Sequence, residues 1–251
     1  MLAAALKKYN VDAEEILKSA ENQKLLQTLS RFAQLLNVYG YQMEAYSESS
    51  LKKLSEVPTD KKEQITTYFE NWSNWIDPDN NPGPVEDIEK VCLKKALDHY
   101  NLEASEEFWK TLEKDHIIEL YGEDMVQLYR SLSFFRVTGY SLLDISVFEW
   151  YVLWQRSVKA IEETMNDAQQ VIRNFIPLKK FEIQKQLVHE VYDVGSKEEA
   201  FVPRTVLAEF MYFGSLTKKN AFHVNTPRGF ICSSRAKVLA QGEDTTNIRF
   251  L

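Results

Sequence analysis

Apolar residues recur at three- and four-residue steps in the first third of the chain, over residues 25–39 and again over residues 65–75. Such spacing places them on one side of a helix, with polar residues on the other. The pattern therefore predicts that the first forty residues are helical and that a second helix runs from about residue 59 to residue 77. The stretch 47–62, rich in Ser, Lys and Glu, is expected to be a polar connector.

Three of the seven prolines fall within residues 77–84, which is the clearest break in the chain. Further helices are expected over 85–99 and 105–114, the latter with Ser105 as its N-cap. From residue 147, apolar residues at alternating steps of four and three predict one unbroken helix, whose seam can pair within the chain or between chains. The seam consists of Val147, Tyr151, Trp154, Val158, Ile161, Met165, Ala168 and Ile172.

Around residue 116 the hydrophobic pattern changes from helical to strand-like. Residues 117–121 and 125–129 predict two strands of a hairpin, joined by the turn Gly122-Glu123-Asp124. The tract 174–219 gives mixed signals, because a strand at 181–183 or 188–192 is followed by an apparent helix near 203–212. Strands are expected again at 221–224, 230–239 and 248–251.

Two segments of the second half resemble a PAS domain. The first contains the hairpin just described, then Phe134-Phe135-Arg136 and Thr138-Gly139-Tyr140-Ser141, and is similar to the opening strand, turn, strand, short helix and TGYS turn of that family. The second contains Arg228-Gly229-Phe230 and Gly242-Glu243-Asp244, and is similar to the last PAS hairpin. The resemblance covers residues 115–251 and implies a small-molecule or protein ligand, without identifying it.

These elements predict a predominantly helical α+β protein. An N-terminal helical region, 1–110, has a candidate break at 77–84 and precedes an α+β domain, 111–251, built as a PAS-like antiparallel sheet with helices. The alternative is a mainly α-helical bundle with a small β appendage.

The composition narrows the classes of protein to consider. With 251 residues, 44% hydrophobic and 12% aromatic, the chain is too apolar to be disordered. No run approaches the roughly 18 apolar residues of a membrane span, and no signal peptide is evident. The two cysteines lie 140 positions apart and cannot form a disulfide framework, which predicts a reducing compartment such as the cytoplasm.

The net charge of −7 argues against a general binder of nucleic acid or anionic membranes. Six basic residues against two acidic ones nevertheless give residues 215–251 a net charge of +4, which leaves −11 for the rest. Cations with interleaved aromatic residues are also typical of single-strand nucleic-acid surfaces. We favour docking of this tail on the acidic N-terminal part of the chain.

Candidate ligand-binding residues lie in the apolar tract that follows the hairpin. Burying a lone charge is costly, so Arg136 is expected to pair with Asp144 or Glu149. Such a pair is either a core ion pair or a polar contact in a ligand pocket lined by aromatic side chains. The candidate ligand-binding residues are Arg136, Tyr140, Glu149, Trp150 and Trp154.

Candidate metal ligands are Glu113, His116 and Glu119, because steps of three residues place side chains on one face of a helix. A di-iron site needs a second such group and the sequence has none, so a solvated helix end is the simpler interpretation. Cys232 and His223 are residue types that can act as nucleophile and base. A small half-buried cysteine is the simpler interpretation there, and no catalytic residue or cofactor is identified.

The first functional hypothesis is a cytoplasmic, non-enzymatic regulatory or sensory module. It is expected to bind a small molecule or a partner protein, to form a homodimer or a partner complex through its helices, and to signal through helix packing. The second hypothesis is a helical metal-dependent enzyme or metal-binding bundle, and the third is an interaction scaffold. The sequence identifies neither a ligand nor an output partner.

Overall fold

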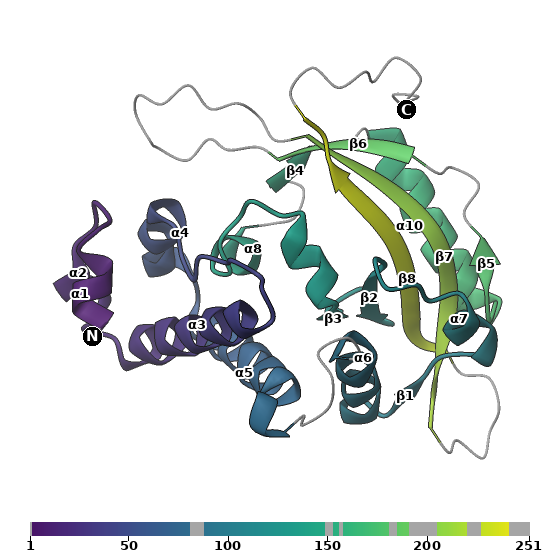
Figure 1. The fold of residues 1–251 in the computed structure, drawn as a ribbon, viewed down its shortest axis with the longest axis horizontal. Coiled ribbons are helices and arrows are strands. Elements are labelled where there is room, and N and C mark those ends of the chain that lie inside the picture. The colour runs from purple at the N-terminus through teal and green to yellow at the C-terminus, as the bar shows by residue number, and fades with distance from the viewer. Residues whose placement is uncertain are drawn as a thin grey trace. The chain divides into compact units, whose positions relative to one another are not determined.

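The computed structural model describes residues 2–80, 88–148, 153–155, 158–180, 185–190, 205–219 and 227–240 (Figure 1). The chain forms two compact units. The described residues of the first lie within Met1–Val85 and Thr138–Trp154, and those of the second within Glu86–Val137, Gln155–Glu190 and Pro203–Leu251. The predicted boundary between residues 110 and 111 falls inside the second unit.

The first unit is helical. Its helices are α1 (Leu2–Leu6), α2 (Ala13–Ile16), α3 (Ala20–Val38), α4 (Glu48–Lys53), α5 (Thr59–Ile76) and α8 (Asp144–Val147), with short 3-10 turns at Leu54–Glu56 and Pro78–Asn80. The helical prediction for the first forty residues is confirmed in part, because they form three helices of which α3 is the longest, and the predicted helix at 59–77 is confirmed as α5. The expected polar connector at 47–62 is wrong, because Ser47 forms a capping box with Ser50 and begins α4.

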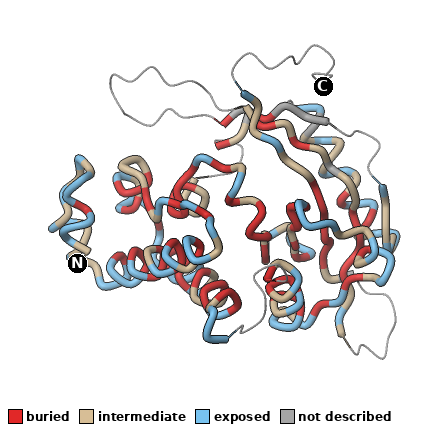
Figure 2. Tube along the Cα trace, in the orientation of Figure 1, coloured by how far each residue is buried: buried red, intermediate tan, exposed pale blue. Residues whose placement is uncertain are grey.

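The core of this unit lies between α3 and α5. Buried positions recur along both helices with the spacing that the sequence predicted (Figure 2). The ring of Phe32 on α3 lies 5.1 Å from the rings of both Phe69 and Trp72 on α5. Aromatic packing of this kind adds to the burial of apolar area, which dominates the stability of such a helix pair.

The segment after residue 138 is hydrogen-bonded to the residues before α4. The backbone N–H groups of Leu142 and Leu143 donate to the carbonyl oxygens of Glu44 and Ala45, each at 3.0 Å. The buried carboxylate of Asp144 accepts hydrogen bonds from the backbone N–H of Ser141 at 2.9 Å and from the Ser47 hydroxyl at 2.5 Å. This network is what a buried carboxylate needs, since an unpaired charge there would be costly.

The second unit is built on an antiparallel sheet. Its long strands are β2 (Ile117–Gly122), β3 (Gln127–Arg130), β6 (Lys185–Glu190), β7 (Thr205–Lys218) and β8 (Pro227–Val238), in the order β3-β2-β8-β7-β6. Short strands β1 (Leu102–Glu103) and β5 (Lys179–Lys180) pair with β7. In β4 (Trp154–Gln155), the first residue belongs to the first unit and the second residue to the second unit. The α+β class and the hairpin of β2 and β3 are therefore confirmed, and the sheet is larger than a small appendage.

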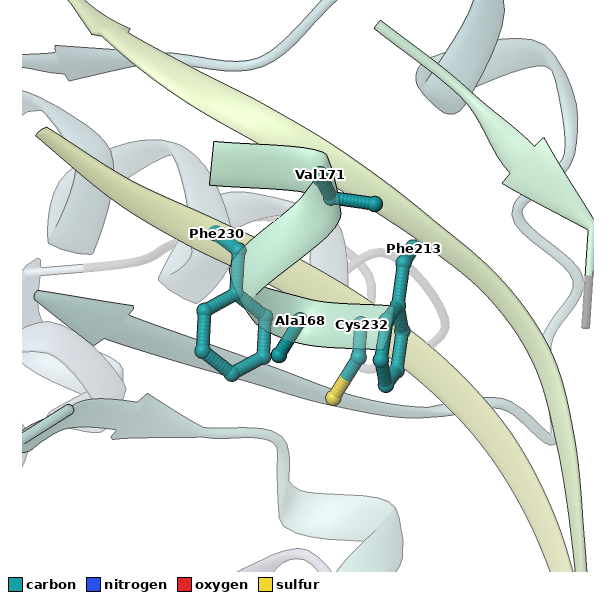
Figure 3. Packing of buried hydrophobic residues seen from close by; sticks show 5 residues of the cluster. All are labelled: Ala168, Val171, Phe213, Phe230 and Cys232. Atoms are coloured by element: carbon teal, nitrogen blue, oxygen red, sulfur yellow. The ribbon is translucent and has the colours of Figure 1, made fainter. Parts of the chain in front are cut away.

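Helices of the second unit are α6 (Ile88–His99), α7 (Glu106–Lys110), the 3-10 helix η4 (Leu132–Arg136) and α10 (Val158–Arg173). Ser105 caps α7 as predicted, accepting a hydrogen bond from the backbone N–H of Phe108. Helix α10 packs on β7 and β8. Figure 3 shows this core, where Ala168 and Val171 of α10 meet Phe213, Phe230 and Cys232 of the two strands.

Two predictions about the second half of the chain are wrong. The apparent helix near 203–212 is strand β7, because pairing with both β6 and β8 satisfies its backbone. The unbroken helix from residue 147 is also absent, since α8 ends at Val147, Trp154 lies in β4 and α10 begins at Val158. Seam residue Tyr151 and the predicted strands at 221–224 and 248–251 lie outside the described residues.

Close backbone packing explains one glycine at the start of β8. Gly229 has a φ of 151°, in the range that favours glycine, and pairs with Gly122 of β2. A Cβ at this position would lie 1.9 Å from the carbonyl oxygen of Tyr121. Any side chain at residue 229 would therefore separate the two strands.

Candidate functional site

A cavity of about 240 Å³ lies in the second unit, beside α6 and β2. Its wall is formed by α6, by the segment between α7 and β2, and by the beginning of β2. Both charged and apolar side chains line it. The lining residues are Glu89, Lys90, Leu93, Leu112, Glu113, Lys114, His116 and Ile118.

His116 is the most buried polar residue of this wall, with 2% of its surface exposed. Its Nδ1 accepts a long hydrogen bond, 3.5 Å, from the backbone N–H of Glu113, whereas its buried Nε2 has no hydrogen-bond partner within the described part of the chain. Because Nδ1 is the acceptor, the proton of the neutral imidazole resides on Nε2. A buried donor without an acceptor costs about 1–3 kcal/mol, so an acceptor placed beside this N–H would be favourable.

The electrostatic surroundings keep the imidazole neutral. Burial lowers the pKa of His116 below 6.5, and the nearby guanidinium of Arg235 lowers it further. The carboxylates of Asp115 and Glu113 act in the opposite direction but are the smaller influences. His116 is therefore a hydrogen-bond donor rather than a cation near neutral pH.

Glu89 on α6 holds the beginning of η4. Its Oε2 accepts a hydrogen bond from the backbone N–H of Leu132 at 2.9 Å, and its Oε1 accepts from the N–H and hydroxyl of Ser133 at 2.6 and 2.8 Å. The two backbone N–H groups are among those that the first turn of a helix leaves unpaired. Burial raises the pKa of Glu89, while the three hydrogen bonds and the charge of Arg136 oppose that rise.

Arg235 of β8 lies against the acidic residues between α7 and β2. Its guanidinium forms ion pairs with Glu113 and with Asp115, the latter with Nε 3.1 Å from Oδ2. Two other cations of the basic tail also pair with acids of the same unit, Lys219 with Asp98 and Arg228 with Glu123. These described residues of the tail therefore pair with acidic residues of their own unit.

The structure brings together only part of the predicted metal set. Ligand atoms of Glu113, Asp115 and His116 lie within 4.8 Å of one another. Glu119 lies on β2 and accepts hydrogen bonds from Arg130 Nε at 2.7 Å and Gln127 Nε2 at 2.8 Å. The helix assumed for the spacing ends at Lys110, so Glu113 and Glu119 do not share a helical face.

The predicted ligand set is divided between the units. Tyr140 and Trp154 belong to the first unit, where their rings form an edge-to-face pair at 5.4 Å and the Tyr140 hydroxyl donates to the carbonyl of Leu153. Arg136 is an exposed residue of η4 in the second unit. Glu149 and Trp150 lie outside the described residues.

Cys232 lies in the core of the second unit and not at a reactive surface. Burial raises its pKa well above 9.0, and the adjacent Glu119 carboxylate, 3.8 Å from Sγ, raises it further. The thiol therefore stays protonated, which opposes a role as a nucleophile. His223, its proposed base, lies outside the described residues.

The sequence predicts two of the cavity residues, Glu113 and His116. It gives no signal for Glu89, Lys90 and Lys114, because α6 and the segment before β2 are brought together only by the fold. Comparison with family models, with curated proteins and with solved structures finds no match for this chain. No helix formed by the described residues is both long and apolar enough to cross a bilayer.

Proposed function

We propose that the chain is a non-enzymatic regulatory module of the PAS type, which binds a small molecule in the cavity of its second unit. The observation that carries the proposal is His116, a lining residue whose buried Nε2 has no partner among the residues that the structure describes, in a wall that also contains charged and apolar groups. Concave sites with a few unsatisfied polar groups and apolar walls are typical of small-molecule binding.

The arrangement of the sheet supports the PAS-like interpretation. The two segments that resemble that family are far apart in sequence, yet β2 pairs with β8 along Ile117–Gly122 and Gly229–Ser234. The hairpin of β2 and β3 is followed directly by η4, which corresponds to the short helix that the resemblance implies. Both segments thus contribute to one sheet, and the cavity lies beside its strand β2.

The contacts of Glu89 provide a route from the cavity to the rest of the unit. Glu89 lines the cavity and also caps η4 through Leu132 and Ser133. A ligand that moves α6 by a fraction of an ångström would change these short hydrogen bonds and so the position of η4. Signalling through helix packing needs such an element, whose equilibrium the ligand biases.

Native mass spectrometry of the purified full chain tests the proposal. We expect the wild type to retain an added mass that is absent after denaturation, and His116→Ala to lose it. His99→Ala is the matched control, because His99 is an exposed residue of α6 that does not line the cavity. An added mass that persists in His116→Ala would contradict binding in this cavity.

An interaction scaffold is a second candidate, favoured by the surface of α10. Val158 and Met165, two residues of the predicted seam, are 71% and 36% exposed. The same spectra distinguish the candidates. A dimer without added mass that dissociates in Met165→Glu would favour the scaffold, whereas a liganded chain of either oligomeric state favours the sensor.

A further inference from the structure

We propose that the cavity beside α6 binds a small organic carboxylate with an apolar chain. The inference rests on the proposed function, because it concerns the same cavity, and it specifies the chemical class of the ligand. It follows from comparing the polar groups of the wall that have hydrogen-bond or ion-pair partners in the fold with those that do not.

The acceptors of the wall are engaged by partners that belong to the fold. The carboxylate of Glu89 receives three hydrogen bonds, from Leu132 and Ser133. The carboxylate of Glu113 is paired with the guanidinium of Arg235. Neither carboxylate therefore offers a free charge to a cationic ligand.

The donors of the wall remain open. Among the residues that the structure describes, Nε2 of His116 has no acceptor, and no hydrogen bond or ion pair engages the ammonium groups of Lys90 or Lys114. Both lysines are exposed at the cavity wall. Two ammonium groups and one N–H are complementary to an anion with two acceptor oxygens, and charge-assisted hydrogen bonds are the stronger kind.

The remaining wall sets the size and the polarity of the rest of the ligand. Leu93 and Ile118 are buried and, with Leu112, give the cavity an apolar side. The cavity, at about 240 Å³, is smaller than the roughly 300–1,000 Å³ typical of sites for drug-sized ligands, so it suits a short-chain ligand. Hexanoate, with six carbons and two oxygens, matches this size, whereas inorganic phosphate would leave the apolar wall uncovered.

Titration calorimetry on the full chain tests the inference with four probes: hexanoate, its neutral isostere hexanamide, the cation hexylamine, and inorganic phosphate. We expect hexanoate to bind, hexanamide to bind at least tenfold more weakly, and the other two not to bind. The double variant Lys90→Gln/Lys114→Gln should weaken hexanoate at least tenfold. Because both side chains are exposed, this variant avoids the risk that His116→Ala fails to fold. Lys94→Gln, an exposed lysine of α6 outside the cavity, should leave the affinity unchanged.

The outcomes separate the two proposals. Hexanamide or hexylamine binding as tightly as hexanoate would overturn the carboxylate class while leaving a ligand-binding cavity in place. Phosphate binding alone would overturn the apolar part of the inference, and an unchanged affinity in the double lysine variant would overturn the role of the lysines. Binding of no probe, together with a wild type that carries no added mass, would overturn the proposed function itself.

Discussion

Replacing Glu89 by alanine should loosen the beginning of η4 without disturbing the helical first unit. The change removes the acceptor of three hydrogen bonds and leaves the N–H groups of Leu132 and Ser133, both buried, without partners. Each orphaned buried donor costs about 1–3 kcal/mol. Removing the carboxylate also removes the cost of burying it, which is the cost that raises its pKa. We therefore expect a net loss of about 2–3 kcal/mol in local stability.

Amide hydrogen exchange is the appropriate assay, because it reports local opening residue by residue. A loss of about 2–3 kcal/mol corresponds to roughly 30- to 150-fold faster exchange at Leu132 and Ser133. Glu89→Gln should have a smaller effect, since its amide oxygen can still accept from Ser133 while its NH₂ faces the Leu132 N–H. Lys94→Ala, an exposed change on α6, is the control. Unchanged exchange at Leu132 and Ser133 in Glu89→Ala would refute the capping role.

The pH dependence gives an independent check of the same residue. The folded-state pKa of Glu89 is raised above 4.5, so the native state binds its proton more tightly than the unfolded chain. This contribution to stability is complete below pH 4.5 and is lost as the pH rises through the folded-state pKa. Glu89→Gln should abolish that loss, as measured by urea denaturation across this range.

Three further changes test the rest of the second unit. The pKa of His116 is lowered below 6.5, so the unfolded chain binds more protons than the folded one and stability should fall as the pH drops below 6.5. In His116→Gln, the melting temperature measured by thermal denaturation should depend less on pH in this range. Arg235→Ala removes the cation that pairs with Glu113 and Asp115. Titration calorimetry should therefore show that zinc binds this variant at least tenfold more tightly than the wild type. Gly229→Ala should lower the free energy of unfolding by more than about 3 kcal/mol in urea denaturation. Gly40→Ala is the control, because Gly40 has a positive φ but open space around it, and should lower it by about 1 kcal/mol. Equal losses in the two variants would contradict the close approach of β2 and β8.

The helices of the first unit could be predicted because their information is local. In α3 and α5 the apolar spacing matches the helical period, and each apolar stripe packs against the other helix. The hairpin of β2 and β3 could be predicted for the same reason, since its turn and both strands are contiguous. Each of these elements needs only its own residues to indicate its type and its buried face.

Strand β7 could not be predicted, because its conformation depends on distant partners. Residues 203–212 contain Leu, Ala, Glu and Met, which favour helix, and begin with a proline. In the fold, Leu207 pairs with Leu187 of β6 on one side and Lys237 of β8 on the other. The gain from two ladders outweighs a helix propensity of a few tenths of a kcal/mol per residue.

The cavity could not be predicted for a related reason, which also bears on its selectivity. By sequence its charged residues are two glutamates and two lysines, which suggests no preference for either sign of charge. In the fold, Leu132 and Ser133 engage one glutamate and Arg235 engages the other. The sign of the charge that the wall presents to a ligand is thus set by residues 40 or more positions away from each glutamate. Without Arg235, the free carboxylate of Glu113 would make the same wall favour a cation. The carboxylate proposed for the wild type and the zinc binding predicted for Arg235→Ala therefore depend on the same ion pair.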